Sequence, residues 1–263
     1  MALGETVDFE RFEDASFEPE QGEIIREGLV RLHVNGIELV RLMCSPVQLD
    51  RLALGFLWNE RIIRSLDDVR RVVVCPSGAC VEVWLRDSAW IPTGKPVLTS
   101  GCGGGITFAD LSDSVQPLRS ALSVTPGQLI RLMVALLAGG AERQRGAHAA
   151  ALAMGETLLA TAEDVGRHNT IDRLCGQFLV EGLLTRDHIL LSTGRISSEM
   201  LLKAARMEVP VVVSRSSPTS LSVALAQAWG ITLVGYVRRT GFNVYAGQRR
   251  IAREQEVTSD AKS

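Results

Sequence analysis

Residues 189–235 read ILLSTGRISSEMLLKAARMEVPVVVSRSSPTSLSVALAQAWGITLVG, and this stretch decides the fold. Three short apolar runs, over 189–192, 209–214 and 231–235, alternate with amphipathic segments over 198–207 and 219–228. Short apolar runs rich in valine and isoleucine are typical of buried strands, and the longer periodic segments between them are typical of helices. Strands that alternate with helices form parallel sheets covered on their faces. The stretch therefore predicts a three-layer α/β core with parallel strands.

The residues upstream extend this core. A helix is predicted to open at Pro126 and to stop before Gly139, because proline favours the first helical position and glycine ends helices. A hairpin over 149–161 and a helix over 166–180 follow. We expect all of these elements to form one α/β domain over 124–263.

The N-terminal part has a different pattern. Two alternating runs meet at Asn35-Gly36, which is a strong hairpin signal. Ser45 and Pro46 are suited to be the N-cap and first residue of a helix that reaches about residue 60. The sequence predicts a smaller α+β domain over 22–123, preceded by a loosely ordered acidic tail over 1–21. Its expected strands cover 23–26, 29–34, 37–42, 71–75 and 80–85.

Composition limits the classes of function. The chain has 263 residues, 46% hydrophobic and 22% charged, with a formal net charge of −2 and a pI near 6.1. Proteins that bind nucleic acid or anionic membranes in general carry a basic excess, so we expect neither partner. No run approaches the about 18 apolar residues of a membrane span, and the first residues do not resemble a signal peptide. We predict a cytoplasmic protein.

Cysteine usage agrees with that compartment. The five cysteines are odd in number and lack paired spacing, which favours a reducing environment over a disulfide framework. Cys75 and Cys80 are interpreted as hairpin residues, and Cys175 as an inert thiol on a buried helical face. The cysteines are Cys44, Cys75, Cys80, Cys102 and Cys175.

Cys102 stands in Thr99-Ser100-Gly101-Cys102-Gly103-Gly104-Gly105, with glycines on both sides. Glycine-rich backbone suits neither a helix nor a strand interior, so the segment is predicted to be a loop that presents its thiol. A tight turn with a chance cysteine is the alternative. The loop lies at the expected junction between the two domains, which is a common place for sites.

Two loops of the α/β core combine hydroxyl groups with arginine. Ser192-Thr193-Gly194-Arg195 follows one predicted strand, and Ser214-Arg215-Ser216-Ser217 follows the next. Loops beyond the carboxyl ends of parallel strands build ligand crevices, and helix N-termini attract anions. We therefore expect a phosphate-rich ligand here, with ordinary helix capping as the alternative.

A third cluster, Glu163-Asp164-Val165-Gly166-Arg167-His168-Asn169, leaves a strand and enters a helix. On that helix His168 and Asp172 are i, i+4 neighbours that could pair. The alternative is a capped helix start, with Asp164 as the N-cap and a solvated His168.

Other chemistries find less support. His148 lacks the His-x-Glu and Cys-x-x-Cys companions of a zinc deaminase, and the cysteine spacing offers no metal set, so we expect no intrinsic metal. No Gly-x-Ser-x-Gly elbow is present, which disfavours serine hydrolysis. A hydrolase or deaminase acting on nucleotides is therefore the least favoured function.

Taken together, the motifs resemble the formate dehydrogenase accessory sulfurtransferase family, FdhD/NarQ. The similarity covers about residues 24–251. It is carried by residues 163–169, 192–197, 203–205, 217–219 and 230–238, together with Asn35-Gly36, residues 54–57 and residues 148–150.

The resemblance implies a cytidine-deaminase-like core that lacks zinc, commonly as a homodimer. It also implies a sulfur carrier that takes sulfur from a cysteine desulfurase and passes it to the molybdenum (or tungsten) bis-guanine-dinucleotide cofactor, for use by the formate dehydrogenase catalytic subunit. The persulfide-carrying cysteine corresponds to Cys102. The cofactor-contacting segment corresponds to Tyr236, Val237, Arg238, Arg239, Thr240 and Gly241, and we expect further ligand contacts from Arg195, Thr193, Ser214, Ser217 and His168.

The chain departs from the family pattern at two places. Gly105 stands where the loop usually has a second cysteine, and Gln144-Arg145-Gly146 stands where Thr-Gly-Gly is usual. A single loop thiol cannot form a disulfide within the loop, so a two-cysteine relay is not expected. The alternative function is a non-catalytic chaperone that binds and delivers the molybdenum cofactor.

Overall fold

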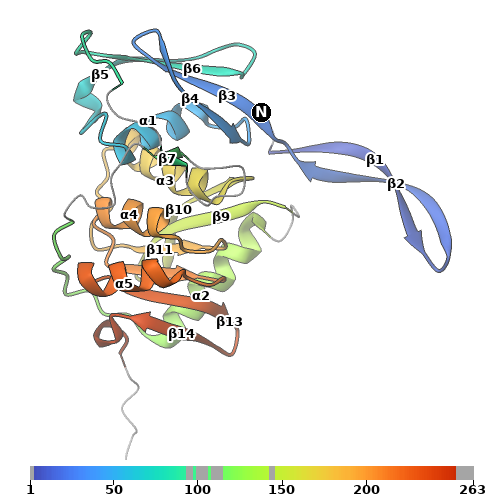
Figure 1. Ribbon diagram of the computed structural model, residues 1–263. Helices are drawn as coiled ribbons and strands as arrows, with labels where there is room; N and C mark the ends of the chain where they lie inside the picture. The colour runs from blue at the N-terminus through green and yellow to red at the C-terminus, as the bar shows by residue number, and fades with distance from the viewer. Residues whose placement is uncertain (1–2, 93–96, 99–105, 108–114, 142–145, 253–263) are drawn as a thin grey trace, which may run out of the picture.

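The computed structural model describes residues 3–92, 97–98, 106–107, 115–141 and 146–252. Two sheets stand at opposite ends of the body, with helices between them (Figure 1). The larger sheet has six strands in the order β10-β9-β11-β12-β13-β14. Its strands are β9 (His148–Met154), β10 (Thr157–Asp164), β11 (Ile189–Ser192), β12 (Val211–Ser214), β13 (Thr232–Arg238) and β14 (Gly241–Ala246).

The predicted parallel strands are confirmed. β11, β12 and β13 run parallel, with Ile189 opposite Val211 and Val211 opposite Thr232. The sheet is nevertheless mixed, because β9, β10 and β14 pair antiparallel with their neighbours. The sequence did not predict β14, whose side chains are mostly half-buried and so do not form a clear apolar run.

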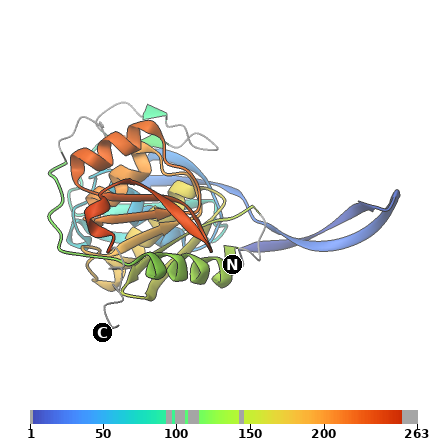
Figure 2. The same cartoon turned by 90° about the horizontal axis from the view of Figure 1, so that it is seen from below.

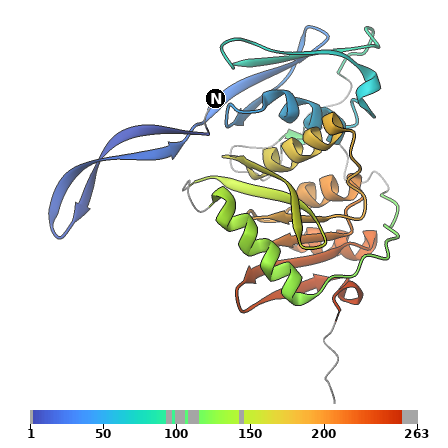
Figure 3. The ribbon, with the colours of Figure 1, turned by 180° about the vertical axis from the view of Figure 1, so that it is seen from behind.

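Helices cover both faces of this sheet. α2 (Pro126–Leu136) packs on one face, while α3 (Arg167–Glu181), α4 (Ser198–Arg206) and α5 (Ser220–Trp229) cover the other (Figures 1 and 3). Alternate residues of β9 divide between the two cores: Ala149 and Ala151 face α2, whereas Ala150 and Leu152 face α3 and α4. The side chains of Thr125, Ser197 and Thr219 cap α2, α4 and α5. The predicted three-layer core is therefore present.

The N-terminal part forms a separate layer. Its sheet has the order β4-β3-β6-β5, and α1 (Leu49–Asn59) lies between this sheet and α3 (Figure 1). A second apolar core fills the space between α1 and the sheet. The strands are β3 (Gly28–Val34), β4 (Ile37–Cys44), β5 (Val69–Val74) and β6 (Cys80–Leu85); β7 (Val97–Leu98) and β8 (Ile106–Thr107) form a separate short pair.

Two glycines let α1 and α3 touch through their backbones. A Cβ added to Gly55 would fall on the carbonyl oxygen of Asp172, and one added to Gly176 would fall on the carbonyl oxygen of Arg51. Any larger residue at either position would force the helices apart. This contact fixes the N-terminal layer against the α/β core.

A buried ion pair joins the same two parts. Arg173 on α3 binds Asp164 at the end of β10, and it also donates to the carbonyl oxygens of Ser45, Val47 and Gln48. The prediction that Ser45 caps the next helix is wrong: α1 begins at Leu49, after Gln48. Ser45 instead accepts a hydrogen bond from the Val165 amide and donates its own amide to Asp164.

The first residues are not the loosely ordered tail that the sequence suggested. β1 (Gly4–Glu13) and β2 (Ser16–Ile25) pair along their length and form a hairpin that projects from the body (Figures 1 and 2). We call this hairpin the arm. Polar and apolar side chains are exposed together on the arm, so neither face of it is buried. The alternation of buried and exposed residues from which strands are predicted is therefore missing from its sequence.

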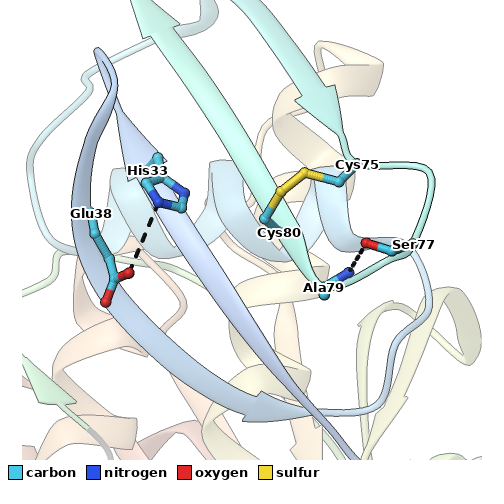
Figure 4. The surroundings of a disulfide bond; sticks show 6 residues. All are labelled: His33, Glu38, Cys75, Ser77, Ala79 and Cys80. Atoms are coloured by element: carbon cyan, nitrogen blue, oxygen red, sulfur yellow. Dashed lines mark hydrogen bonds and ion pairs between the residues drawn. A yellow bond between two sulfur atoms is a disulfide. The ribbon is translucent and has the colours of Figure 1, made fainter.

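Cys75 and Cys80 are joined by a disulfide across the turn between β5 and β6 (Figure 4). They are hairpin residues, as predicted, but the expectation of unpaired thiols is wrong for these two. Their Cα atoms lie 5.3 Å apart because the Cys75 amide and Cys80 carbonyl close the hairpin, which is a distance that a disulfide can bridge.

Candidate functional site

The hydroxyl and arginine loops predicted from the sequence meet at one edge of the large sheet. Each follows the carboxyl end of a parallel strand, and the amide of Arg215 donates to the carbonyl of Ser192 across the gap between β11 and β12. The backbone continues this contact to the next strand, since Tyr236 donates to the carbonyl of Ser216. The three loops therefore form a continuous surface.

Buried hydroxyl groups hold these loops in place. Ser214 donates to the carbonyl of Gly194 at 2.7 Å and accepts from the Ser216 amide at 2.9 Å. Thr193 accepts from the Ala149 amide at 3.0 Å. The hydroxyl groups of Thr193 and Ser214, which we expected to contact the ligand, thus form hydrogen bonds that hold the loops together. Arg195 and Arg215 are exposed, so their guanidinium groups are available to an anion.

Gly194 brings a histidine and an arginine to the same place. A Cβ at Gly194 would lie 2.8 Å from the Cβ of Arg167 and 3.4 Å from Nδ1 of His148, so both side chains pack against its backbone. Burial, followed by the charge of Arg167, lowers the pKa of His148 below its ordinary value. His148 is therefore neutral near pH 7, and an anion bound beside Arg167 would favour its protonation.

His168 lies behind these loops and is buried rather than solvated. Its Nδ1 is 3.0 Å from Glu199, and its Nε2 is 3.4 Å from the hydroxyl of Ser197. The predicted pairing of His168 with Asp172 is wrong, because Asp172 binds Lys203 of α4 at 2.7 Å. Asp164 is not the N-cap either; that position is Gly166, whose amide Asp164 accepts at 2.7 Å.

The buried charges form a chain from α3 to α4. Lys203 lies 3.6 Å from Glu199 as well as 2.7 Å from Asp172, and Asp172 also accepts from Asn59 of α1. Burial opposes the charge of Lys203, but the carboxylates of Asp172, Glu199 and Glu60 outweigh it and raise the pKa of Lys203 above its ordinary value. Lys203 therefore remains a cation, and Glu199 lies between it and His168, 3.6 Å from Lys203 and 3.0 Å from Nδ1 of His168.

The segment over 236–241 leaves β13 and turns into β14. Tyr236 is 44% exposed in the left-handed region, with φ 56°, and Arg238 donates to the carbonyl of Arg215 at 2.6 Å. The side chain of Val237 is buried in the core beneath α2, so only its backbone could meet a ligand. Arg239 and Thr240 are exposed at the turn.

A pocket of about 160 Å³ opens beside this segment. We call it the α2 pocket. Its walls are apolar side chains of α2 and the following turn, and three guanidinium groups stand among them. The lining residues are Ile130, Met133, Val134, Leu137, Ala138, Val237, Arg215, Arg238 and Arg239.

The structure thus places most predicted site residues along one edge. Cys102 lies outside the described residues. Sequence reasoning did not place His148 at this edge, because His148 begins an antiparallel strand next to β11 and reaches Gly194 only through sheet pairing. His168 lies behind the edge, and the predicted residues at the edge itself are Thr193, Arg195, Ser214, Ser217, Tyr236, Val237, Arg238, Arg239, Thr240 and Gly241.

Within the described part of the chain, no group of three His, Cys, Asp or Glu side chains is arranged to hold a metal ion. The helices described there are also too short or too polar to cross a membrane. The absence of an intrinsic metal remains a prediction.

These features define a mixed α/β protein with arginine-bearing loops at the carboxyl edge of its main sheet. The FdhD/NarQ family model matches residues 25–252, and the chain belongs to that family.

Similar proteins and a similar solved structure agree with this family assignment. The sulfur carrier protein FdhD of Staphylococcus aureus strain MRSA252 is 35% identical over 259 residues, covering 95% of this chain and 97% of the relative. The protein of the same name from strain Newman is 34% identical with the same coverage. A crystal structure of a candidate formate dehydrogenase accessory protein from Desulfotalea psychrophila matches with a TM-score of 0.79 and 25% identity, covering 95% of this chain and all of that one.

Proposed function

We propose that this protein carries sulfur on Cys102 from a cysteine desulfurase to a molybdenum or tungsten bis-guanine-dinucleotide cofactor destined for formate dehydrogenase. The names of the relatives support the sulfur-carrying role. The observation that carries the ligand part is the edge formed by Arg195, Arg215 and Arg238, in which the buried Ser214 hydroxyl binds the Gly194 carbonyl and Arg238 binds the Arg215 carbonyl. Guanidinium groups bind phosphate oxygens in a fixed geometry, which suits a dinucleotide.

The sulfur step needs one thiolate. The Cys102 thiolate attacks the outer sulfur of the donor persulfide, a new S–S bond forms on Cys102, and the donor cysteine leaves as a thiolate. Cys102 then holds a persulfide. When its outer sulfur passes to the cofactor, which is the substrate, the S–S bond breaks, Cys102 leaves as a thiolate, and the metal of the substrate supplies the two electrons that reduce the sulfur to sulfide. The other thiols are less suited: burial raises the pKa of Cys44 to about 12 and that of Cys175 well above its ordinary value.

The proposal includes three finer points that follow from the family resemblance. The α/β core is cytidine-deaminase-like, the protein works as a homodimer, and it acts in the cytoplasm. A non-catalytic chaperone for the same cofactor is the second candidate, and Gly105, in place of a second loop cysteine, is the observation that favours it.

Mass spectrometry separates the two candidates. The protein is incubated with a cysteine desulfurase and L-cysteine, and the peptide that contains Cys102 is examined for one added sulfur. We expect that sulfur in the wild type and in the matched control Cys75→Ser/Cys80→Ser, and none at this position in Cys102→Ala. If the wild type never gains sulfur, or if Cys102→Ala restores formate dehydrogenase activity in cells, the chaperone is the better description.

The ligand site has its own test. We expect Arg195→Ala and Arg238→Ala each to weaken GDP binding about tenfold, the loss typical of one charge-assisted contact. Arg186→Ala is the matched control, because Arg186 is an exposed arginine at the opposite end of the sheet. If all three variants bound GDP with equal affinity, Arg195 and Arg238 would not be part of the ligand site.

A further inference from the structure

A carboxylate without a counter-ion lies in a pocket beside the arginine-bearing edge. Glu163 stands at the end of β10, and its half-buried side chain forms no hydrogen bond or ion pair with another residue in the described part of the chain. Burial raises the pKa of Glu163, and no described cation opposes this effect. A carboxylate that loses water without gaining a partner is costly, so such a group in a cleft is a candidate for ligand binding.

The pocket that Glu163 lines has a volume of about 320 Å³. We call it the Glu163 pocket. Val47 before α1, Leu136 at the end of α2 and Ala149 of β9 give it apolar walls, and Glu163 is the one charged residue among the described lining residues. A cavity of about 150 Å³ holds benzene, so this pocket has room for a flat ring system of two fused rings.

Gln48 adds a carboxamide to the same pocket from a fixed backbone. Its φ is 42°, in the left-handed region that residues other than glycine rarely adopt. The buried Arg173 holds this turn by donating to the carbonyl oxygens of Val47 and Gln48. Backbone strain that the surrounding structure holds in place is typical of ligand sites. The pocket therefore offers a carboxylate acceptor and a carboxamide that can donate.

The Glu163 pocket adjoins the edge that holds the arginines. Glu163 lies opposite Ala149 where β10 pairs with β9, and Ala149 exchanges two hydrogen bonds with Thr193, at 2.9 and 3.0 Å. Two strand spacings, ~10 Å, therefore separate β10 from the strand that leads to Arg195. Ribose and phosphate groups can span that distance. One ligand can place its anionic groups at the arginines and an uncharged ring in the pocket.

A 2-amino-4-oxopyrimidine ring satisfies both polar side chains. Its ring N–H and its amino group are neighbouring donors, which the two oxygens of one carboxylate can accept, and its carbonyl oxygen can accept from a carboxamide. A simple ammonium group would also pair with Glu163, but it would leave the apolar walls without a contact. Guanine and pterin both carry the 2-amino-4-oxopyrimidine edge.

We propose that Glu163, with Gln48, binds the 2-amino-4-oxopyrimidine edge of the ligand and selects that ring over other heterocycles. Glu163 accepts from the ring N–H and the amino group, and Gln48 donates to the ring carbonyl. The inference rests on the proposed function, because the guanine and pterin rings of the dinucleotide cofactor are the two sources of this edge. The arginines bind the phosphates, so the two parts of the site can be tested separately.

Calorimetry of the full-length protein tests guanine as the occupant. GDP is compared with IDP, which lacks only the 2-amino group, and with pyrophosphate. We expect the wild type to bind GDP at least about tenfold more tightly than IDP, and Glu163→Gln to bind the two within about twofold, because a hydrogen bond to a charged group is lost. Pyrophosphate affinity should not change. Glu82→Gln, at a half-buried glutamate of β6, is the matched control and should keep the preference for GDP.

Xanthosine diphosphate separates a change of selectivity from a loss of fold. Its base has an oxygen in place of the 2-amino group, so the carboxylate repels it, whereas the carboxamide of Glu163→Gln can donate to it. We expect Glu163→Gln to bind xanthosine diphosphate at least about tenfold more tightly than the wild type does. A misfolded variant cannot gain affinity. Equal affinity for xanthosine diphosphate, together with an unchanged preference for GDP, would exclude guanine from the pocket.

Pterin binding tests the second source. The fluorescent compound 6-hydroxymethylpterin carries the same edge without a phosphate. If its binding falls at least about tenfold in Glu163→Gln while GDP binding does not, the pocket takes the pterin ring, and the reverse result assigns guanine. Either result supports the proposal, and it is overturned if neither ligand depends on Glu163. GDP binding that depends on Arg195 but not on Glu163, with pterin binding equally insensitive, would leave the proposed function standing. A wild type that binds neither ligand would remove both.

Discussion

Arg173 lies with Nη2 2.6 Å from Oδ2 of Asp164, and both side chains are buried between the α/β core and the N-terminal layer. Asp164 ends β10, Arg173 belongs to α3, and the backbone groups that complete their hydrogen bonding come from residues 45–48. The packing of residues 45–48 against β10 and α3, which lie far away in the sequence, therefore depends on one ion pair. Removing one partner of a buried pair leaves an uncompensated charge, which is much more costly than losing a surface pair.

Arg173→Met should lower the free energy of unfolding by about 3–5 kcal/mol, because Asp164 stays buried without its cation. Arg173→Lys should cost less, since it keeps the charge but loses part of the fork of donors. Urea unfolding at neutral pH measures both. Arg186→Met, at an exposed arginine, is the control and should change stability by about 0.5 kcal/mol or less.

Gly55→Ala and Gly176→Ala should each destabilise the protein by more than about 3 kcal/mol, because the new methyl group would meet a backbone carbonyl that cannot turn aside. Gly139→Ala is the matched control, since nothing lies within 4 Å of a Cβ there. Thermal unfolding compares the three variants. Equal melting temperatures would mean that α1 and α3 are not in backbone contact.

Lys203→Met should cost about 3–5 kcal/mol by leaving Asp172 and Glu199 buried without their cation. The double variant Lys203→Met/Asp172→Asn should lose less than the sum of the two single variants, because the second change removes one of the stranded charges. A double-mutant cycle in urea gives the coupling energy. Strict additivity would show that the pair does not form.

His148 should make stability fall in mild acid. Burial and Arg167 lower its pKa in the folded protein, while Asp164 opposes this and His168 and Arg195 add to it. The unfolded chain binds a proton near the ordinary value of 6.5, so the stabilisation is full above that pH and is lost as the pH falls towards the lower folded pKa. His148→Gln should flatten this part of the curve of unfolding free energy against pH. If His148→Gln and the wild type showed the same slope of unfolding free energy against pH, the prediction would be contradicted.

Ser214→Ala should destabilise the protein by about 1–3 kcal/mol, because the Gly194 carbonyl and the Ser216 amide lose a buried partner. The loops that carry Arg195 and Arg215 should shift, so GDP affinity should fall as well. Calorimetry measures that affinity. Ser120→Ala, whose hydroxyl binds the Leu122 amide away from this edge, should leave it unchanged.

The alternation of apolar runs and amphipathic segments over 189–235 predicted the parallel strands and their helices correctly, because the local pattern of each segment agrees with its burial in the folded protein. Ser45 failed as a cap since its hydroxyl is used by Val165, more than a hundred residues away. His168 found Glu199 on another helix instead of its own neighbour. Local spacing cannot reveal partners of this kind. The arm was missed because strand prediction depends on a buried face, and the arm has none within one copy.

The contact of Gly55 with α3 and of Gly176 with α1 has a consequence for how the protein opens. With backbone against backbone, no side chain at these two points can adjust to let the layers separate by degrees. The amides in the middle of both helices should therefore exchange their hydrogens with solvent through one shared opening, at the free energy of global unfolding. Two sheets with separate apolar cores would then behave as one foldon rather than as two units joined by a hinge.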